Sequence, residues 1–279
     1  GQFKAVPLQF IPVSAKLGDN IANRSEQMPW YTGATVLETL GGFQKEAARS
    51  EQPLRMPVQD VYKFDARRII TGRIAAGQLK VGDHLVFSPS NKRANIRTVE
   101  AFNIEPQPTE GQAGQSIGVT LDDQIFVERG EIASHQEHLP SVSTAFRANL
   151  FWLGKRPLEK ERKYLLRVAT KEVDCEVASI HRIIDTMDLA QQQGSNTVNK
   201  NQVAELTLRT KTPVAFDLSA SFEATGRFVL VDEYDIAGGG IITELVHDDQ
   251  EFLREEARRR DFAWVKGEVT VEDRAQQYG

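Results

Sequence analysis

Hydrophobic and polar residues alternate with a period of two through most of the chain, beginning at Leu54. Short apolar runs recur roughly every eight to twelve residues, with glycine or proline between them, a spacing typical of antiparallel barrels and sandwiches. The runs predicted as strands are residues 56–61, 69–74, 85–87, 117–119 and 125–127 in a first module, and 148–153, 164–169, 173–184, 203–208 and 228–232 in a second.

Both ends of the chain depart from this alternation. Residues 8–13 are predicted as one short buried strand and residues 14–20 as a turn-rich loop. Residues 35–40 are predicted as a short helix, because Val36, Leu37 and Leu40 share a face at helical spacing. The charged segment 250–261 predicts a solvated helix through i,i+4 pairs such as Glu255–Arg259, and Thr270 is suited to cap a further helix.

These patterns define the expected architecture. We predict a mainly β protein in which residues 1–50 form a small α/β unit, residues 53–138 and 140–247 form two consecutive antiparallel modules, each a barrel or a sandwich, and residues 248–279 form a charged helical tail. Two stretches of the second module are predicted as connections. The polar residues 191–201 are expected to form an exposed loop, and Gly238, Gly239 and Gly240 are expected to form a loose turn.

Composition narrows the chemistry. The chain has 279 residues with a net charge of −5, which disfavours nonspecific binding to nucleic acid. Its one cysteine, Cys175, rules out an internal disulfide framework, and its place in an alternating run predicts a buried, inert thiol. No apolar run approaches the roughly 18 residues of a membrane-spanning helix.

Catalytic motifs are not evident in the sequence. It contains no Gly-x-x-x-x-Gly-Lys-Ser/Thr run for a nucleotide triphosphate and no Gly-x-Ser-x-Gly elbow, although a dispersed Ser-His-Asp triad stays open. His135 and His138 are close together, but a metal role is disfavoured because they lie in the polar segment between the two modules. The residues alone therefore indicate a β-rich scaffold.

A resemblance to a known family is carried by several motifs. The sequence Phe-Ile-Pro-Val-Ser-Ala-Lys at residues 10–16 resembles the end of the GTP-binding domain in elongation factor Tu-like GTPases, whose Ser-Ala-Lys loop closes over the guanine base. The sequence Pro-Leu-Arg-Met-Pro-Val at residues 53–58, Thr-Gly-Arg at 71–73 and Lys-Val-Gly-Asp at 80–83 are similar to the second domain of that family. Residues 64–68 depart from it, since many relatives have a glycine-rich turn there.

The second module resembles one branch of that superfamily. Residues 151–153, 164–167, 182–185 and 213–217 are similar to the large, GTP-hydrolysing subunit of bacterial sulfate adenylyltransferase. Residues 262–274 resemble the segment that leads into adenylylsulfate kinase, which implies a parent protein fused to that kinase.

The resemblance implies that residues 53–138 and 140–247 are two consecutive antiparallel β-barrels and that residues 1–50 are a small α/β remnant of a GTP-binding domain. It also implies a cytoplasmic protein that binds GTP and Mg²⁺ through a domain preceding Gly1, with Ser14, Ala15 and Lys16 as a remnant of the guanine loop. It implies as partners the chain's own GTP-binding domain, the small subunit of sulfate adenylyltransferase and a following kinase domain. We expect no catalytic residue, no metal ligand and no GTPase activity in this chain alone.

Three alternatives stay open. The chain could be a translation-type factor that binds tRNA or a ribosomal partner, a β-barrel interaction module unrelated to sulfate, or an independent enzyme with an unrecognised site. A basic groove would favour the first, and a pocket of converging titratable groups would favour the last.

Overall fold

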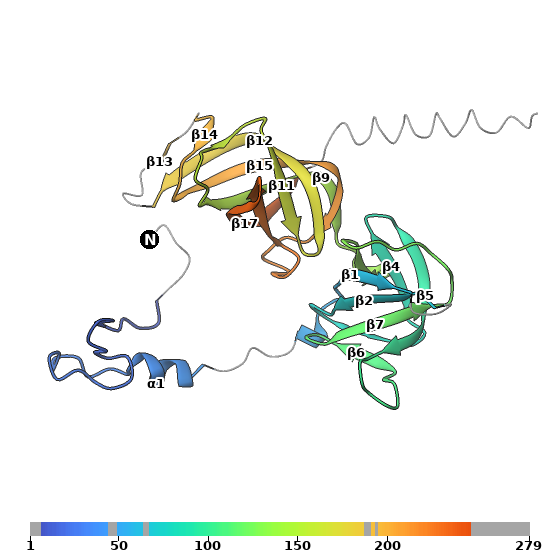
Figure 1. Ribbon diagram of the computed structural model, residues 1–279, viewed down its shortest axis with the longest axis horizontal. Helices are drawn as coiled ribbons and strands as arrows, with labels where there is room; N and C mark the ends of the chain where they lie inside the picture. Colours follow the sequence, from blue (N-terminus) through green and yellow to red (C-terminus); the bar gives the residue numbers. More distant parts are fainter. Residues whose placement is uncertain (1–6, 44–48, 64–66, 187–190, 193–194, 247–279) are drawn as a thin grey trace, which may run out of the picture. The chain divides into compact units, whose positions relative to one another are not determined.

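The computed structural model describes residues 7–43, 49–63, 67–186, 191–192 and 195–246 (Figure 1). The chain separates into two compact units, Gly1–Ala47 and Ala48–Gly279. The helices predicted at 250–261 and after Thr270 lie outside the described residues, as does the kinase-like segment 262–274.

The first unit contains one helix, α1 (Val36–Gly41). Thr35 caps it in a reciprocal arrangement: its hydroxyl accepts from the Glu38 N–H at 3.2 Å, and the Glu38 carboxylate accepts from the Thr35 N–H at 2.8 Å. This capping box satisfies two backbone donors at the start of the helix. The predicted helix at 35–40 is confirmed, but Leu37 and Leu40 are exposed.

The first barrel of the second unit is a closed antiparallel sheet of six strands in the order β1-β2-β7-β5-β4-β8. Its elements, in chain order, are η1 (Arg49–Glu51), β1 (Met56–Tyr62), β2 (Ile69–Arg73), β3 (Gln78–Lys80), β4 (His84–Ser88), β5 (Lys92–Glu100), β6 (Glu110–Gln112), β7 (Ser116–Leu121), β8 (Ile132–His135) and η2 (Gln136–His138), with β3 and β6 pairing separately.

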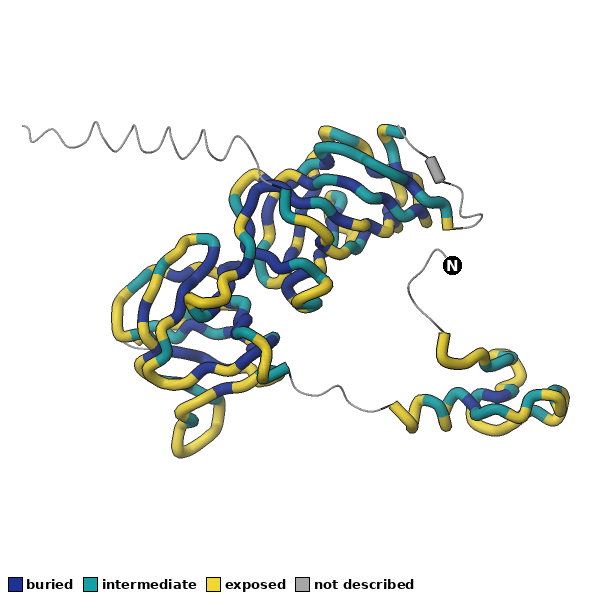
Figure 2. The backbone as a smooth tube through the Cα atoms, turned by 180° about the vertical axis from the view of Figure 1, so that it is seen from behind, coloured by how far each residue is buried: buried dark blue, intermediate teal, exposed yellow. Residues whose placement is uncertain are grey.

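Alternation places one face of each strand inside this barrel. In β5 the buried positions are Ala94, Ile96 and Val99, which fit the predicted period of two apart from a register shift between Ile96 and Thr98. Met56, Leu85, Phe87 and Val119 fill the same core with no more than 1% exposure. Along the strands in Figure 2, dark blue segments for buried residues are interspersed with exposed and intermediate ones.

The predicted strand at 125–127 is wrong, since these residues follow β7 as a loop. Their side chains explain the misreading: Val127 packs into the barrel core, while Phe126 is exposed and Ile125 is only partly buried. An apolar triplet resembles a strand in the sequence, but a strand also needs a neighbour with free backbone groups, and this sheet is already closed.

The buried carboxyl group of Glu131 is expected to make the stability of the first barrel depend on pH. Burial raises the pKa of its carboxyl group, while a hydrogen bond from the Ser90 hydroxyl at 3.1 Å and the charge of Lys92 act in the opposite direction. An acid whose pKa is higher in the folded state than in the unfolded state binds more protons when the protein is folded. Its contribution to the free energy of unfolding is therefore complete below the pKa of the unfolded state, and it is lost as the pH rises through the pKa of the folded state.

We therefore expect Glu131→Gln to raise the free energy of unfolding at pH 7 relative to the native chain, because the amide removes a buried charge. The gain should shrink as the pH falls towards 4.5, the ordinary pKa of this group. Urea unfolding at several pH values measures it, with exposed Glu128→Gln as the matched control. A gain that is independent of pH would contradict this explanation.

The second barrel is larger. It closes through the order β11-β16-β17-β9-β15-β12 with an additional β11–β12 pairing. Its strands are β9 (Ser141–Trp152), β10 (Leu158–Glu159), β11 (Lys163–Val168), β12 (Lys171–Asp185), β13 (Gln191–Gln192), β14 (Thr197–Val198), β15 (Gln202–Phe216), β16 (Arg227–Asp232) and β17 (Asp235–Val246). The mainly β fold with two closed six-stranded barrels is thus confirmed.

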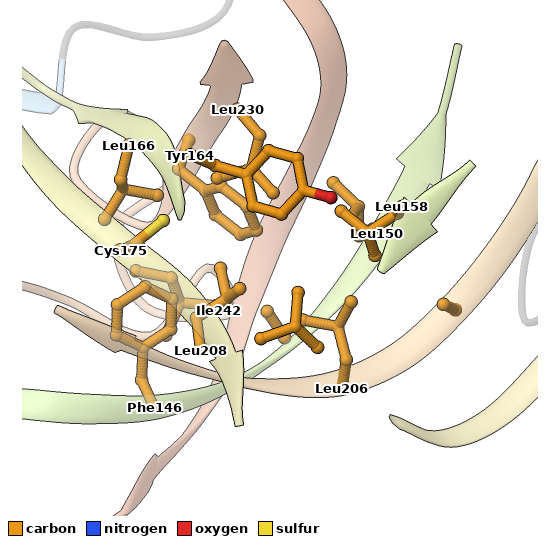
Figure 3. Packing of buried hydrophobic residues seen from close by; sticks show 14 of the residues in the cluster. Phe146, Leu150, Leu158, Tyr164, Leu166, Cys175, Leu206, Leu208, Leu230 and Ile242 are labelled. Carbon is orange, nitrogen blue, oxygen red and sulfur yellow. The ribbon is translucent and has the colours of Figure 1, made fainter. Parts of the chain in front are cut away.

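The core of this barrel is a single apolar cluster (Figure 3). Phe146 packs at 5.1 Å from Phe216 and 5.9 Å from Phe228 between ring centroids, and the rings of Trp152 and Tyr164 meet edge to face at 5.7 Å. Trp152 is fully buried, and its indole N–H donates to the Arg156 carbonyl at 2.8 Å, so its polar edge is satisfied.

Two predictions for this barrel need correction. The segment 191–201 contains the short strands β13 and β14, and Val198 of β14 is fully buried opposite Leu158. Gly238, Gly239 and Gly240 lie inside β17, paired with Trp152, Phe151 and Leu150 of β9. Gly238 and Gly240 make close packing feasible, because an added Cβ atom would lie 2.9 Å from the Trp152 ring at Gly238 and 2.6 Å from the Phe228 ring at Gly240.

Candidate functional site

The loop predicted to be a remnant of the guanine site is built around the side chain of Asn20. This side chain is 1% exposed, donates to the Pro12 carbonyl at 2.8 Å and accepts from the Ser25 N–H at 2.9 Å. Its backbone has φ = 57°, a left-handed conformation that asparagine tolerates better than most residues. Asn20 therefore ties together both sides of the loop that carries residues 14–16.

Ser14, Ala15 and Lys16 form the turn itself. The Gly18 N–H donates to the Ser14 carbonyl at 2.8 Å, and the Leu17 N–H donates to the Ser14 hydroxyl at 3.4 Å. Ala15 and Lys16 are exposed, and their N–H groups have no hydrogen-bond acceptor within residues 7–43. Two adjacent N–H groups in an exposed turn are suited to a carbonyl oxygen of a ligand.

Apolar side chains of the first unit are unusually exposed. Leu8, Phe10, Leu17, Trp30 and Phe43 have exposed fractions of 98%, 80%, 63%, 71% and 68%. The predicted buried strand at 8–13 is wrong for the described residues, which form no strand there. The physical reason is non-local: a strand needs a hydrogen-bonded neighbour, and residues 7–43 contain only isolated bridges such as Ser14–Asp19.

A buried ion pair joins the start of the first barrel to the second barrel. Arg55 Nε donates to Asp217 Oδ2 at 2.8 Å, and Arg55 Nη2 donates to Asp217 Oδ1 at 2.9 Å; the two side chains are 3% and 8% exposed. Arg55 Nη1 donates to the carbonyls of Leu54 and His138 at 2.8 and 2.7 Å. The bidentate geometry is the strongest arrangement for these two groups.

Further contacts complete the surroundings of this pair. The Thr225 hydroxyl donates to Asp217 Oδ2 at 2.6 Å, and the Arg55 guanidinium lies 4.5 Å from the centroid of the Phe222 ring. Sequence reasoning missed this cluster. The available signal was an arginine within the apolar run at 54–58, but its partner is 162 residues away.

The structure also shows the surroundings of the cysteine and of one of the two paired histidines considered above. Cys175 is buried as predicted, and burial raises the pKa of its thiol to about 12, which keeps the thiol protonated at neutral pH. No group of three or more His, Cys, Asp or Glu side chains arranged for a metal occurs among the described residues. His135 instead contacts Asp83, with 3.2 Å between Nε2 and Oδ2. Within the same ranges, no helix combines the length and hydropathy needed to cross a bilayer.

Comparison with known proteins agrees with this architecture. A family model described as GTP-eEF1A C-terminal domain-like matches residues 145–243, which is most of the second barrel. The structure of Sup35 complexed with GDP superposes with a TM-score of 0.66 at 22% identity, covering 86% of this chain and 59% of that one, a likeness that shows the fold.

Three curated relatives are more similar to this chain in sequence than Sup35 is. Bifunctional enzyme NodQ of Rhizobium sp. (strain N33) is 32% identical over 235 residues, 83% of this chain and 36% of NodQ. Sulfate adenylyltransferase subunit 1 of Shewanella oneidensis is 32% identical over 236 residues, 82% of this chain and 48% of the relative. The corresponding protein of Francisella tularensis subsp. tularensis (strain WY96-3418) is 31% identical over 247 residues, 87% of this chain and 51% of the relative.

The fold defines a double-barrel chain whose second barrel matches the GTP-eEF1A C-terminal domain-like family. The chain is a homologue of sulfate adenylyltransferase subunit 1 and NodQ over more than four fifths of its length. It spans between about a third and a half of the length of these relatives.

Proposed function

We propose that this chain is the β-barrel region of a GTP-dependent sulfate adenylyltransferase large subunit, together with the end of its GTP-binding domain. The observation that carries the proposal is the 247-residue match to sulfate adenylyltransferase subunit 1, because it includes more residues than the two barrels contain. In this proposal, the end of the GTP-binding domain is formed by residues 1–50, and the two barrels are residues 53–138 and 140–247. Residues 248–279 lead to a kinase domain. The whole protein is located in the cytoplasm.

The first unit supports a role within a larger domain. Its exposed apolar side chains would be covered if the remainder of a GTP-binding domain packed on them, which removes apolar area from water. Its local hydrogen bonds around Asn20 would hold the loop at 14–16 in place for the guanine base, with the free N–H groups of Ala15 and Lys16 as donors.

The fit to GTP and Mg²⁺ is therefore partial. The loop at 14–16 is suited to the base, whereas the triphosphate requires a backbone cradle and a lysine that no run of this sequence supplies. We assign phosphate and Mg²⁺ binding to the preceding domain of the parent protein and no catalytic residue to this chain.

The barrels are assigned the role of docking surfaces for the GTP-binding domain and the small subunit. The Arg55–Asp217 pair supports this role, because a buried bidentate pair constrains the contact between the barrels and so gives a partner a defined surface. The competing tRNA or ribosome reading would require a basic surface, and the net charge of −5 disfavours it.

Size-exclusion chromatography of this chain with the purified small subunit of the same organism, with and without GTP, tests the proposal. We expect co-elution that does not depend on GTP, and no GTP hydrolysis by the chain alone. The matched comparison is a chain with the preceding domain restored. Absence of co-elution for both chains would overturn the assignment, and co-elution only after restoration would remove the docking role from the barrels.

A further inference from the structure

A pocket of about 410 Å³ lies beside β2, β5, β7 and the loop that follows β7. Its apolar lining comes from Ile70, Leu121 and Ile125, and its polar lining includes Arg67, Arg68 and Arg97. This volume falls within the range of about 300–1,000 Å³ seen for small-molecule sites, and such sites combine an apolar lining with a few placed polar groups.

Two of the three arginines have no ion-pair partner among the described residues, namely Arg68 and Arg97. Arg67 differs from them, since its Nη1 lies 3.5 Å from Glu100 Oε1. The guanidinium of Arg68 stacks on Phe126 with its carbon 4.1 Å from the ring centroid. Stacking fixes the plane of a guanidinium while leaving its N–H edges free to donate, so Arg68 is preorganised for an acceptor.

Two aspartates also line the pocket and limit what it can bind. Asp122 accepts from the backbone and side-chain N–H groups of Asn95 at 2.9 and 2.6 Å, and from the Asp123 N–H at 2.9 Å. The Asn95 side chain is the main reason why the pKa of Asp122 lies below its usual range. Asp122 is therefore ionised, but its oxygens are already bonded on the side of Asn95.

The charges of Arg68 and Arg97 are thus balanced overall by Asp122 and Asp123. A polyanion such as nucleic acid needs a surface with a clear excess of positive charge, which this pocket does not have. A small ligand with one anionic group can still bind, because guanidinium groups form directed, bidentate hydrogen bonds with tetrahedral oxyanions.

We propose that this pocket binds a small molecule with one phosphate or sulfate group on an apolar or planar body. Arg68 and Arg97 hold the oxyanion, and Leu121 and Ile125 contact the body. The proposal does not depend on the function proposed above.

Phenyl phosphate and phenyl sulfate are suitable probes, with benzyl alcohol as the uncharged control. Binding to the full chain is followed by NMR of ¹³C-labelled isoleucine and leucine methyl groups, which reports on Ile70, Leu121 and Ile125. We expect both oxyanions to shift these signals and benzyl alcohol to have at least tenfold lower affinity. The stronger of the two oxyanions identifies phosphate or sulfate as the preferred group.

Substitutions locate the site. Arg97→Gln and Arg68→Gln should each weaken oxyanion binding at least tenfold, while Arg93→Gln should leave it unchanged. Arg93 is the matched control because it is exposed on the same strand, β5, but does not line the pocket. Thermal unfolding confirms that each variant is folded. Equal effects of Arg93→Gln and Arg97→Gln, equal binding of benzyl alcohol, or no methyl shifts at millimolar probe would each overturn the proposal.

Discussion

Replacing Arg55 by leucine is expected to lower the free energy of unfolding by about 3–5 kcal/mol, the range observed when one partner of a buried ion pair is removed. The reason is the partner left behind. The buried Asp217 carboxylate would lose both hydrogen bonds from Arg55 and would keep, of the side-chain hydrogen bonds described above, the one from the Thr225 hydroxyl. Urea unfolding at pH 7 measures the loss.

A matched exposed pair provides the control. Arg167 and Glu172 join adjacent strands with Nε and Oε1 2.9 Å apart, and both are more than two fifths exposed. Arg167→Leu should cost no more than about 1 kcal/mol, because water screens exposed pairs. The double variant Arg55→Leu/Asp217→Leu should recover most of the loss, since it removes the stranded charge. A loss for Arg55→Leu no larger than that for Arg167→Leu would contradict the role assigned to burial.

Adding one methyl group at Gly240 is expected to destabilise the second barrel by about 1–3 kcal/mol, the typical cost of overpacking a core. A Cβ atom there would lie 2.5 Å from the Asn149 carbonyl oxygen and 2.6 Å from Phe228 Cζ. Neither group can move freely, because Asn149 is paired within the sheet and the Phe228 ring packs against Phe146.

The neighbouring glycine is an internal control for the same strand. At Gly239 the nearest atom to an added Cβ would be the Phe228 carbonyl oxygen at 3.8 Å, an ordinary contact. Gly239→Ala should therefore be neutral or slightly stabilising, since alanine reduces the conformational entropy of the unfolded chain. Thermal unfolding of both variants checks the prediction, and equal destabilisation would show that strand propensity rather than packing decides the effect.

Alternation was a reliable guide where one strand face is buried. The segment predicted at 203–208 lies within β15, and its residues Ala204, Leu206 and Leu208 are fully buried as the period of two requires. The extent of strands was less accessible: β9 begins at Ser141, well before the predicted residue 148, because pairing with a neighbour extends a strand beyond its apolar positions.

Contacts between residues that are distant in the chain could not be predicted from the sequence. Val198 is a single apolar residue in a polar segment, and nothing local indicates that it is buried opposite Leu158. Arg68 and Arg97 line one pocket because β2, β5 and β7 are neighbours in the sheet, an order that the chain sequence does not reveal. The loop at 14–16 was placed as a turn, whereas its assignment to guanine came from the resemblance and stays a prediction.

Closure of the two sheets limits the ways in which a partner could bind to the barrels, if they have the proposed docking role. Each of the six strands in either barrel already has a hydrogen-bonded neighbour on both sides. A partner cannot add its own strand to these closed rings, the route used by many peptide-binding domains, and among the described strands free edges occur on the short β13 and on the pairs β3–β6 and β10–β14. Under the proposed docking role, recognition by the closed rings would therefore depend on side chains and loops, and a surface substitution could change the partner without changing the backbone pairing of the barrel.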